Sequence, residues 1–453
     1  MSRWSLLRHE ADAVVRLAAP VVLVQVGMML MGTVDAMMLG RHSELALAAG
    51  ALGNSVSFGL ISFPMGILMV LDPLIAQAYG AERHGRVARH FKRGLVLAAA
   101  LSIPLSLAMW RTDGVLRIVG QKPEIIAESA AYIRTLIWGN LPFLLFIAFR
   151  QSLQAMSQVR PAAIAIVIAN LFNVLANYGL IFGNFGLPAL GVVGSAYATS
   201  LSRCVMFLCV TLLAWPLLRP YLRGSWRAPM VAGPFWQKLR LGVPIGVHTS
   251  LEMWLFVSVA LMMGNLGARE LAAHQIALSM ASLSFMVPLG ISGAAATRVG
   301  NAIGRLDPAG ARRAAAVSLA LGAGVMSISA LTFWLAPAHL SRLFTNEAGV
   351  IAVAVTLLPI AAAFQVFDGL QVVSLGALRG AADTRFPALI ALIGFWFLGL
   401  PLAAYLGYQT ELGPRGLWWG ITLGLSSVAI LLLFRLRQRF TSPLVAFVDQ
   451  DED

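Results

Sequence analysis

Long apolar stretches, separated by short polar connectors, follow one another along the whole chain. Each stretch reaches about 20 residues, the length that a helix needs to cross the hydrocarbon core of a bilayer. The pattern predicts an all-α membrane protein with twelve transmembrane helices. The predicted spans lie near residues 14–38, 46–74, 94–111, 126–149, 161–182, 192–218, 240–264, 272–297, 314–336, 350–375, 386–407 and 416–436.

The second half of the chain repeats the first half in one register. Both repeats hold six spans, an even number, so they enter the membrane in the same direction. We predict two six-helix lobes related by a pseudo-two-fold axis along the membrane normal, and such a duplication indicates a transporter. The predicted parts are an N-terminal lobe (1–220), a connector (221–240) and a C-terminal lobe with a short tail (241–453). The matching pairs are Pro20 with Pro244, Pro64 with Pro288, Gly66 with Gly290, Gly80 with Gly304 and Arg89 with Arg313.

Composition and charge agree with a membrane protein. Charged residues make up 12% of the chain, about half of the roughly 25% that a soluble domain carries. The net charge of +13 does not predict nucleic-acid binding, because the basic residues cluster in connectors such as 81–94 and 435–440. Such clusters meet anionic head groups of membrane lipids. They occupy both ends of the chain and every second connector, so the positive-inside rule places both termini and the 221–240 connector in the cytoplasm.

The candidate carboxylates inside the predicted spans are Asp35, Asp72, Glu252 and Asp368. A charged side chain costs about 2.5 to 3.5 kcal/mol at the middle of a transmembrane helix, and it usually marks an ion or proton pathway. The alternative is hydration at the end of a span. This alternative applies best to Asp72, which precedes Pro73 close to a cytoplasmic connector.

Amide side chains form a polar stripe on the fifth predicted helix. Asn170, Asn173 and Asn177 follow one another at helical spacing and therefore share one face. Such a stripe can form hydrogen bonds between helices. Its oxygens, together with a carboxylate, also suit a hard cation such as Na⁺. The two interpretations are compatible.

Polar residues recur around the acids of the second half. Gln365, Asp368 and Gln371 are spaced by three residues on the tenth predicted helix. On the seventh helix, His248 precedes Glu252 by four residues, so their side chains are adjacent. This pair can exchange protons near neutral pH or form a static hydrogen bond.

Motifs for ATP-driven transport and for catalysis are absent from the sequence. None of the three lysines (Lys92, Lys122 and Lys238) follows a glycine as in a P-loop. The sequence also has no H-E-x-x-H motif. We therefore expect neither an enzyme nor a cofactor, and we infer that an ion gradient drives transport.

Four segments resemble those of one transporter family. They are LDPLIAQAYGAERHGRVAR (71–89), LAAHQIAL (271–278), RVGNAIGR (298–305) and GALRGAADTRFP (376–387). With these segments the chain resembles the multidrug and toxic compound extrusion (MATE) transporters, in particular the bacterial NorM-like branch, over nearly its whole length. The resemblance implies an inner-membrane monomer in which two lobes alternate access. It also implies export of amphipathic, often cationic compounds in exchange for inward Na⁺ or H⁺.

The resemblance also assigns a cation or proton site in the N-terminal lobe. The acid on the first helix corresponds to Asp35, and polar groups on the fifth and sixth helices correspond to Asn173, Asn177 and Thr199. Some relatives carry Asp at the position of Asn177. One negative charge is therefore missing by comparison, and the sequence leaves the choice between Na⁺ and H⁺ open.

A second site is implied in the C-terminal lobe. The acids of the NorM-like branch on the seventh and tenth helices correspond to Glu252 and Asp368. Phe364 stands where some relatives carry Tyr, so an aromatic face remains there for a cation or a drug. Further candidates with an accessory role are His248, Gln365 and Asp72.

The rival hypothesis within the same superfamily is a flippase for lipid-linked sugars or a peptidoglycan precursor. A flippase needs cationic residues in its cavity to bind a pyrophosphate. The candidates well inside the predicted spans are Arg134 and Arg203. Because acids dominate there, the sequence favours cationic cargo.

Overall fold

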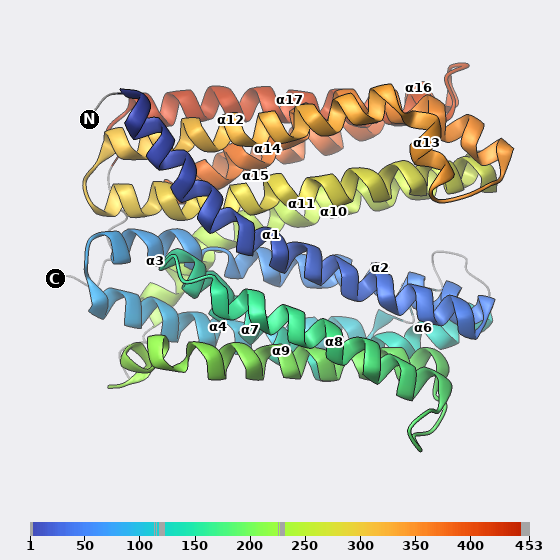
Figure 1. Ribbon diagram of the computed structural model, residues 1–453, viewed down its shortest axis with the longest axis horizontal. Helices are drawn as coiled ribbons and strands as arrows, with labels where there is room; N and C mark the ends of the chain where they lie inside the picture. The colour runs from blue at the N-terminus through green and yellow to red at the C-terminus, as the bar shows by residue number, and fades with distance from the viewer. Residues whose placement is uncertain are drawn as a thin grey trace. The chain divides into compact units, whose positions relative to one another are not determined.

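The computed structural model describes residues 3–112, 114, 116, 123–224, 226 and 232–444. These residues form helices joined by short turns (Figure 1), and no strand occurs among them. Lys122 and the predicted tail beyond residue 444 lie outside the described residues. The elements are α1 (Arg3–His42), α2 (Glu44–Leu68), α3 (Leu71–Gly80), α4 (His84–Trp110), α6 (Pro123–Leu136), η1 (Ile137–Gly139), α7 (Asn140–Ala155), α8 (Arg160–Phe182), α9 (Gly191–Leu222), α10 (Ala232–Leu266), α11 (Ala268–Gly304), α12 (Pro308–Leu335), α13 (Pro337–Arg342), α14 (Ala348–Gly380), α15 (Arg385–Ala391), η3 (Leu392–Gly399), α16 (Leu400–Tyr408) and α17 (Pro414–Thr441).

Twelve helical segments of the described chain are long and apolar enough to cross a membrane. Each segment overlaps one predicted span, so the prediction of twelve transmembrane helices is confirmed. Most segments extend beyond the apolar stretch that predicted them. For example, α4 begins at His84 instead of near residue 94, because the helical hydrogen-bond pattern continues through polar residues outside the hydrocarbon core.

Three of the twelve segments contain a change of helical geometry. The predicted span 46–74 is divided between α2 and α3. Pro73 lies in the first turn of α3, where backbone N–H groups have no partner within the helix, so a proline is tolerated there. The other changes are the 3₁₀ turn η1 between α6 and α7 and the π-helical η3 between α15 and α16.

The chain divides into two compact units. Among the described residues, the N-unit contains 23–246, and the C-unit contains 3–22 together with 247–444. Val22 and Gly246 are equivalent positions of the sequence repeat. Each half of the sequence therefore contributes the start of its first helix, α1 or α10, to the other unit. The predicted lobe boundaries near residues 220 and 241 stay a prediction.

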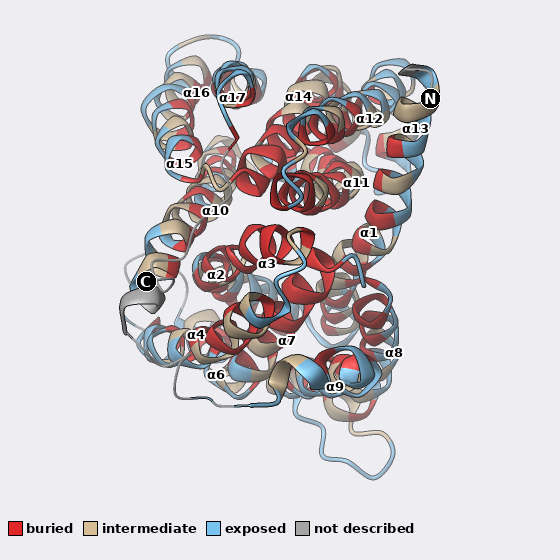
Figure 2. Ribbon diagram, turned by 90° about the vertical axis from the view of Figure 1, so that its left-hand side faces the viewer, coloured by how far each residue is buried: buried red, intermediate tan, exposed pale blue. Residues whose placement is uncertain are grey.

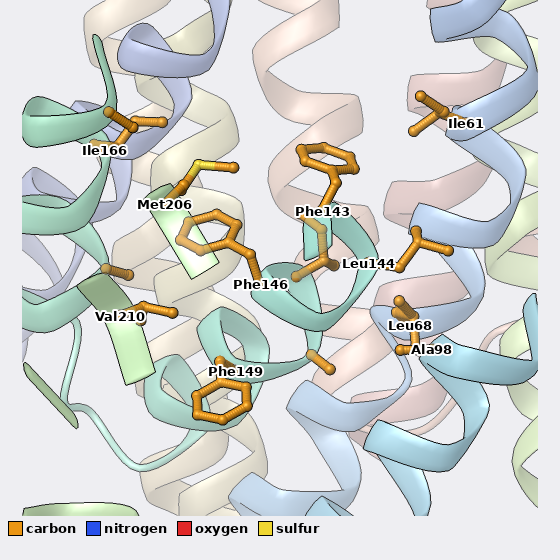
Figure 3. Packing of buried hydrophobic residues seen from close by; sticks show 14 of the residues in the cluster. Ile61, Leu68, Ala98, Phe143, Leu144, Phe146, Phe149, Ile166, Met206 and Val210 are labelled. Carbon is orange, nitrogen blue, oxygen red and sulfur yellow. The ribbon is translucent and has the colours of Figure 1, made fainter. Parts of the chain in front are cut away.

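Aromatic side chains fill the core of the N-unit. Phe149 of α7 contacts Phe91 of α4 and Phe207 of α9 in edge-to-face geometry, with ring centroids 5.2 and 5.5 Å apart, which is a favourable arrangement for aromatic rings. Figure 3 shows this core, with Phe143 and Phe149 projecting from α7 and Met206 of α9 nearby. Helix α7 therefore packs against both α4 and α9 in this core.

Small residues bring α11 and α14 of the C-unit close together. The Ser292 hydroxyl of α11 donates a hydrogen bond to the Val372 carbonyl oxygen of α14 at 2.7 Å. A β-carbon at Gly376 would lie 2.3 Å from the Ser292 carbonyl oxygen, so a glycine is required for this approach. The facing sides of both helices are buried in Figure 2.

The contact at Gly376 predicts a specific loss of stability. We expect Gly376→Ala to lower the free energy of unfolding by about 1 to 3 kcal/mol, the usual cost of overpacking. In α12, a β-carbon added at Gly324 meets nothing within 4 Å. Gly324→Ala should therefore be neutral or stabilise by up to about 1 kcal/mol. Thermal unfolding in detergent compares the two variants, and equal melting temperatures would contradict the close packing of α11 and α14.

Candidate functional site

The carboxylate of Asp35 lies inside the N-unit, where two side chains donate hydrogen bonds to it. The Asn177 amide donates to Oδ1 and the Thr199 hydroxyl to Oδ2, both at 2.6 Å. The same Asn177 nitrogen also lies 3.1 Å from Asn173 Oδ1. All four side chains are buried, with Thr199 the most accessible at 7%. The structure thus brings together the four residues that the sequence assigns to the N-terminal lobe, and we call them the Asp35 cluster.

Two helices position the partners of Asp35. Asn173 and Asn177 are one turn apart on α8, and α9 packs against α8 and carries Thr199. Asn170, the third amide of the stripe, is bonded differently, because its side chain donates to the carbonyl oxygens of Gly27 on α1 and Ile166 on α8. The stripe therefore forms the predicted hydrogen bonds between helices through Asn170, which joins α8 to α1. Asn177 bonds to the carboxylate and to Asn173, and cation binding by these amides stays a prediction.

The Asp35 cluster keeps polar atoms that no described residue satisfies. Asn177 Oδ1 and Asn173 Nδ2 are buried and have no hydrogen-bond partner among the described residues. Together with the carboxylate and the Thr199 hydroxyl, the cluster offers several oxygen atoms and a single negative charge. Oxygen ligands suit a hard monovalent cation, and the carboxylate can alternatively take up one proton. This donor set fits either Na⁺ or H⁺.

A second group of acidic and polar residues lies inside the C-unit. Gln371 of α14 donates a hydrogen bond to Glu252 Oε1 of α10 at 3.3 Å. Asp368, one turn before Gln371 on α14, is buried within electrostatic range of Glu252. His248 Nδ1 is 4.0 Å from Glu252 Oε2, which is too long for a hydrogen bond. The four residues Glu252, Asp368, Gln371 and His248 form what we call the Glu252 cluster.

Two further predicted residues of α14, Gln365 and Phe364, contact neighbouring helices. Gln365 donates hydrogen bonds to the hydroxyls of Ser329, at 2.8 Å, and Ser284. Phe364 is buried between Phe256 and Trp418, with ring centroids 6.2 and 6.1 Å away. The geometry therefore gives Gln365 the role of a link between helices and gives Phe364 a position inside an aromatic cluster.

His274 is a buried polar residue that the sequence analysis did not single out. It lies in the segment LAAHQIAL and packs against Trp418, with ring centroids 5.7 Å apart. Neither ring nitrogen has a hydrogen-bond partner among the described residues. The motif containing His274 was a signal for the family, but its spacing gave no indication that the ring joins the aromatic cluster around Phe364.

The structure corrects the hydration alternative for Asp72. This residue is fully buried, and the Gln154 amide of α7 donates a hydrogen bond to Asp72 Oδ2 at 2.9 Å. The position near the end of a span suggested a hydrated carboxylate, but α3 packs against α7 and encloses the side chain. Asp72 is not among the hydrogen-bond partners of the Asp35 cluster.

The two units do not carry equivalent acids. In the register of the repeat, Val259 stands in the second half at the position of Asp35, and it is fully buried. Leu144, also fully buried, stands in the first half at the position of Asp368. The duplication therefore preserves the helices, whereas each unit has its own arrangement of polar residues.

Buried carboxylates in both halves of a duplicated, twelve-helix membrane chain indicate a transporter. The family model described as MatE matches residues 20–179 and 244–405, so its two matches begin at the equivalent residues Pro20 and Pro244. The chain belongs to the MatE family, and within it the chain is a bacterial NorM-like MATE transporter of the inner membrane.

Relatives are similar over nearly their full length. The probable multidrug resistance protein NorM of Mesorhizobium japonicum is 38% identical, over 98% of this chain and 97% of that protein. The multidrug resistance protein MdtK of Yersinia pseudotuberculosis is 34% identical, over 97% and 98%. The crystal structure of the eukaryotic MATE transporter AtDTX14 matches with a TM-score of 0.89 at 24% identity, over 96% and 98%, and so has the same fold.

Proposed function

We propose that this transporter is an antiporter that exports amphipathic, cationic drugs and toxic compounds in exchange for inward Na⁺ or H⁺ by alternating access. The observation that carries the proposal is the Asp35 cluster, a single buried carboxylate held by Asn177 and Thr199. The names of the relatives, multidrug resistance proteins, support drug export. We further propose that the protein acts as a monomer with both termini in the cytoplasm.

Competition for buried carboxylates explains how an ion can expel a drug. A carboxylate in an apolar interior binds one monovalent cation favourably, because a second positive charge there is neither neutralised nor hydrated. Inward movement of each coupling ion gains about 2.3 kcal/mol per 100 mV of membrane potential. Binding of Na⁺ or H⁺ at Asp35, and at Glu252 or Asp368, therefore displaces a cationic compound toward the outside.

The flippase alternative is not favoured by the surroundings of the two arginines within the spans. Arg134 is exposed, and its guanidinium lies 5.6 Å from the centre of the Trp110 ring. The guanidinium of Arg203 lies over Phe143 and within electrostatic range of Asp35. Both guanidiniums thus lie over aromatic rings, and that of Arg203 has an acidic neighbour.

Transport in vesicles tests the proposed function. Inverted membrane vesicles containing the protein are given ethidium, a cationic dye, and an outward-directed Na⁺ gradient or pH gradient is then imposed separately. This direction corresponds to inward ion movement in the cell. We expect one gradient to drive uptake of the dye. The proposal fails if neither gradient does so while the same vesicles translocate a lipid-linked pyrophosphate.

The Thr199 hydroxyl should contribute measurably to ion binding. Thr199→Ala removes a hydrogen-bond donor from the Asp35 carboxylate and one potential ion ligand. If Na⁺ is the coupling ion, we expect its half-saturating concentration to rise about ten-fold, the equivalent of a hydrogen bond to a charged group. If H⁺ is the coupling ion, the lost donor favours protonation of the carboxylate, and the half-saturating proton concentration should fall. Thr199→Ser keeps the hydroxyl and should remain close to wild type. A Thr199→Ala variant with unchanged ion dependence would place ion binding elsewhere.

A further inference from the structure

Arg203 lies next to the Asp35 cluster. It follows Thr199 by one turn of α9, so the two side chains share the face of the helix that meets Asp35. The guanidinium of Arg203 is within electrostatic range of two buried side chains, Asp35 and Tyr132. Arg203 is twelve residues from the first residue of α9, or about 18 Å along the helix. A positive charge at this depth of a membrane helix costs free energy, so Arg203 is a candidate for a functional residue.

Packing holds the Arg203 side chain in place. Its guanidinium lies over the Phe143 ring of α7, 4.9 Å from the ring centre, a distance at which a cation and an aromatic ring attract each other. A β-carbon at Gly139 of η1 would lie 2.9 Å from Arg203 Cδ, so the missing side chain makes room for the arginine. The interruption of the helix at η1 thus lies against the stem of Arg203.

Hydrogen bonds alone do not explain why an arginine stands at position 203. Its Nη1 is buried and has no hydrogen-bond partner among the described residues. An arginine kept only to join helices would use its donors, because an unmade hydrogen bond in a buried site costs free energy. The remaining contribution of this side chain is its charge, which lies within electrostatic range of the carboxylate of the proposed ion site.

We propose that Arg203 is a resident countercharge that lowers the affinity of the N-unit for its coupling ion and so permits rapid release of the ion. The empty pair of Asp35 and Arg203 is neutral, and the loaded site carries one positive charge. This inference rests on the proposed ion coupling at Asp35. At the effective dielectric constant of a protein, a fixed charge several ångströms from the ion changes its affinity by about ten- to a hundred-fold.

The transport arm of the test separates affinity from maximal rate. In the vesicle assay, the initial rate of ethidium uptake is measured against the concentration of the driving ion, Na⁺ or H⁺. We expect Arg203→Gln to lower the half-saturating ion concentration about ten-fold or more and to lower the maximal rate, because release becomes slow. Arg203→Lys retains the charge and should stay close to wild type.

Arg134 offers a control, because it is also an arginine inside a predicted span and its guanidinium lies over an aromatic ring, that of Trp110. Arg134→Gln should leave the half-saturating ion concentration unchanged. An unchanged value in Arg203→Gln, or an equal shift in Arg134→Gln, overturns the proposal. If Arg203→Gln does not accumulate in the membrane, Arg203→Met replaces it, with the same expected shift.

A double-mutant cycle in detergent tests the pair without transport. The melting temperatures of wild type, Asp35→Asn, Arg203→Gln and the double variant are compared at one pH and salt concentration. We expect the two substitutions to be non-additive, as for charges that interact directly. Additive effects overturn the proposal. If neither gradient drives uptake by the wild type, the proposed ion coupling fails, and this cycle still decides whether Arg203 acts on Asp35.

Discussion

Asp35→Asn is expected to reduce ion-driven efflux to the level of vesicles without the protein, with no loss of protein from the membrane. The substitution preserves the shape of the side chain but removes the only negative charge of the Asp35 cluster. An amide cannot take up a proton at physiological pH or neutralise a bound Na⁺. Its NH₂ group would also replace one of the two oxygens that now accept hydrogen bonds from Asn177 and Thr199.

The measurement is the initial rate of ethidium uptake into inverted vesicles under an imposed Na⁺ or pH gradient. Asp12, an exposed carboxylate on the same helix α1, provides the control. Asp12→Asn removes an equal charge from α1 and should transport at the wild-type rate. Wild-type transport by Asp35→Asn would show that the coupling ion does not bind in the N-unit.

Asp368→Asn is expected to abolish ion-driven efflux as well, through the C-unit. Asp368 and Glu252 lie within electrostatic range of each other, so their negative charges repel when both are ionised. A proton or Na⁺ relieves this repulsion, which makes the pair a strong site for one cation. Neutralising Asp368 removes this repulsion, so binding of a cation no longer relieves it and the affinity of the pair for the ion falls.

The same vesicle assay measures this effect, with direct binding of ethidium in detergent as a second readout. Glu347 is exposed and immediately precedes α14, so Glu347→Gln serves as the matched control and should behave like wild type. If Asp368→Asn transports normally while Asp35→Asn does not, the C-unit has no part in coupling.

Much of the fold follows from local patterns. Apolar runs of membrane length identify all twelve helices because the bilayer forces each backbone hydrogen bond into a helix. The spacing of Asn173 and Asn177 places both amides on one face, and the structure shows that this face meets Asp35. Here a rule about one helix was sufficient, since the polar face of a membrane helix has to avoid lipid.

Other features depend on contacts between distant segments. The partner of Asp72 is Gln154, 82 residues further along the chain, and no periodicity connects the two. Likewise, the sequence presents Arg203 as an isolated arginine, and only the packing of α9 against α7 and η1 places it over Phe143 and near Asp35. Distances between helices decide these pairings, and a pattern within one helix does not contain them.

The two halves of this duplicated chain carry their buried acids at different positions, so one half cannot replace the other. Val259 and Leu144 stand where the other half has Asp35 and Asp368. A chain assembled from two first halves would therefore carry two Asp35 clusters and no Glu252 cluster, and two second halves would give the reverse. Under the proposed ion coupling, such hybrids would differ in the number of ions bound per transport cycle. The difference between the two halves would then set the stoichiometry of the proposed coupling.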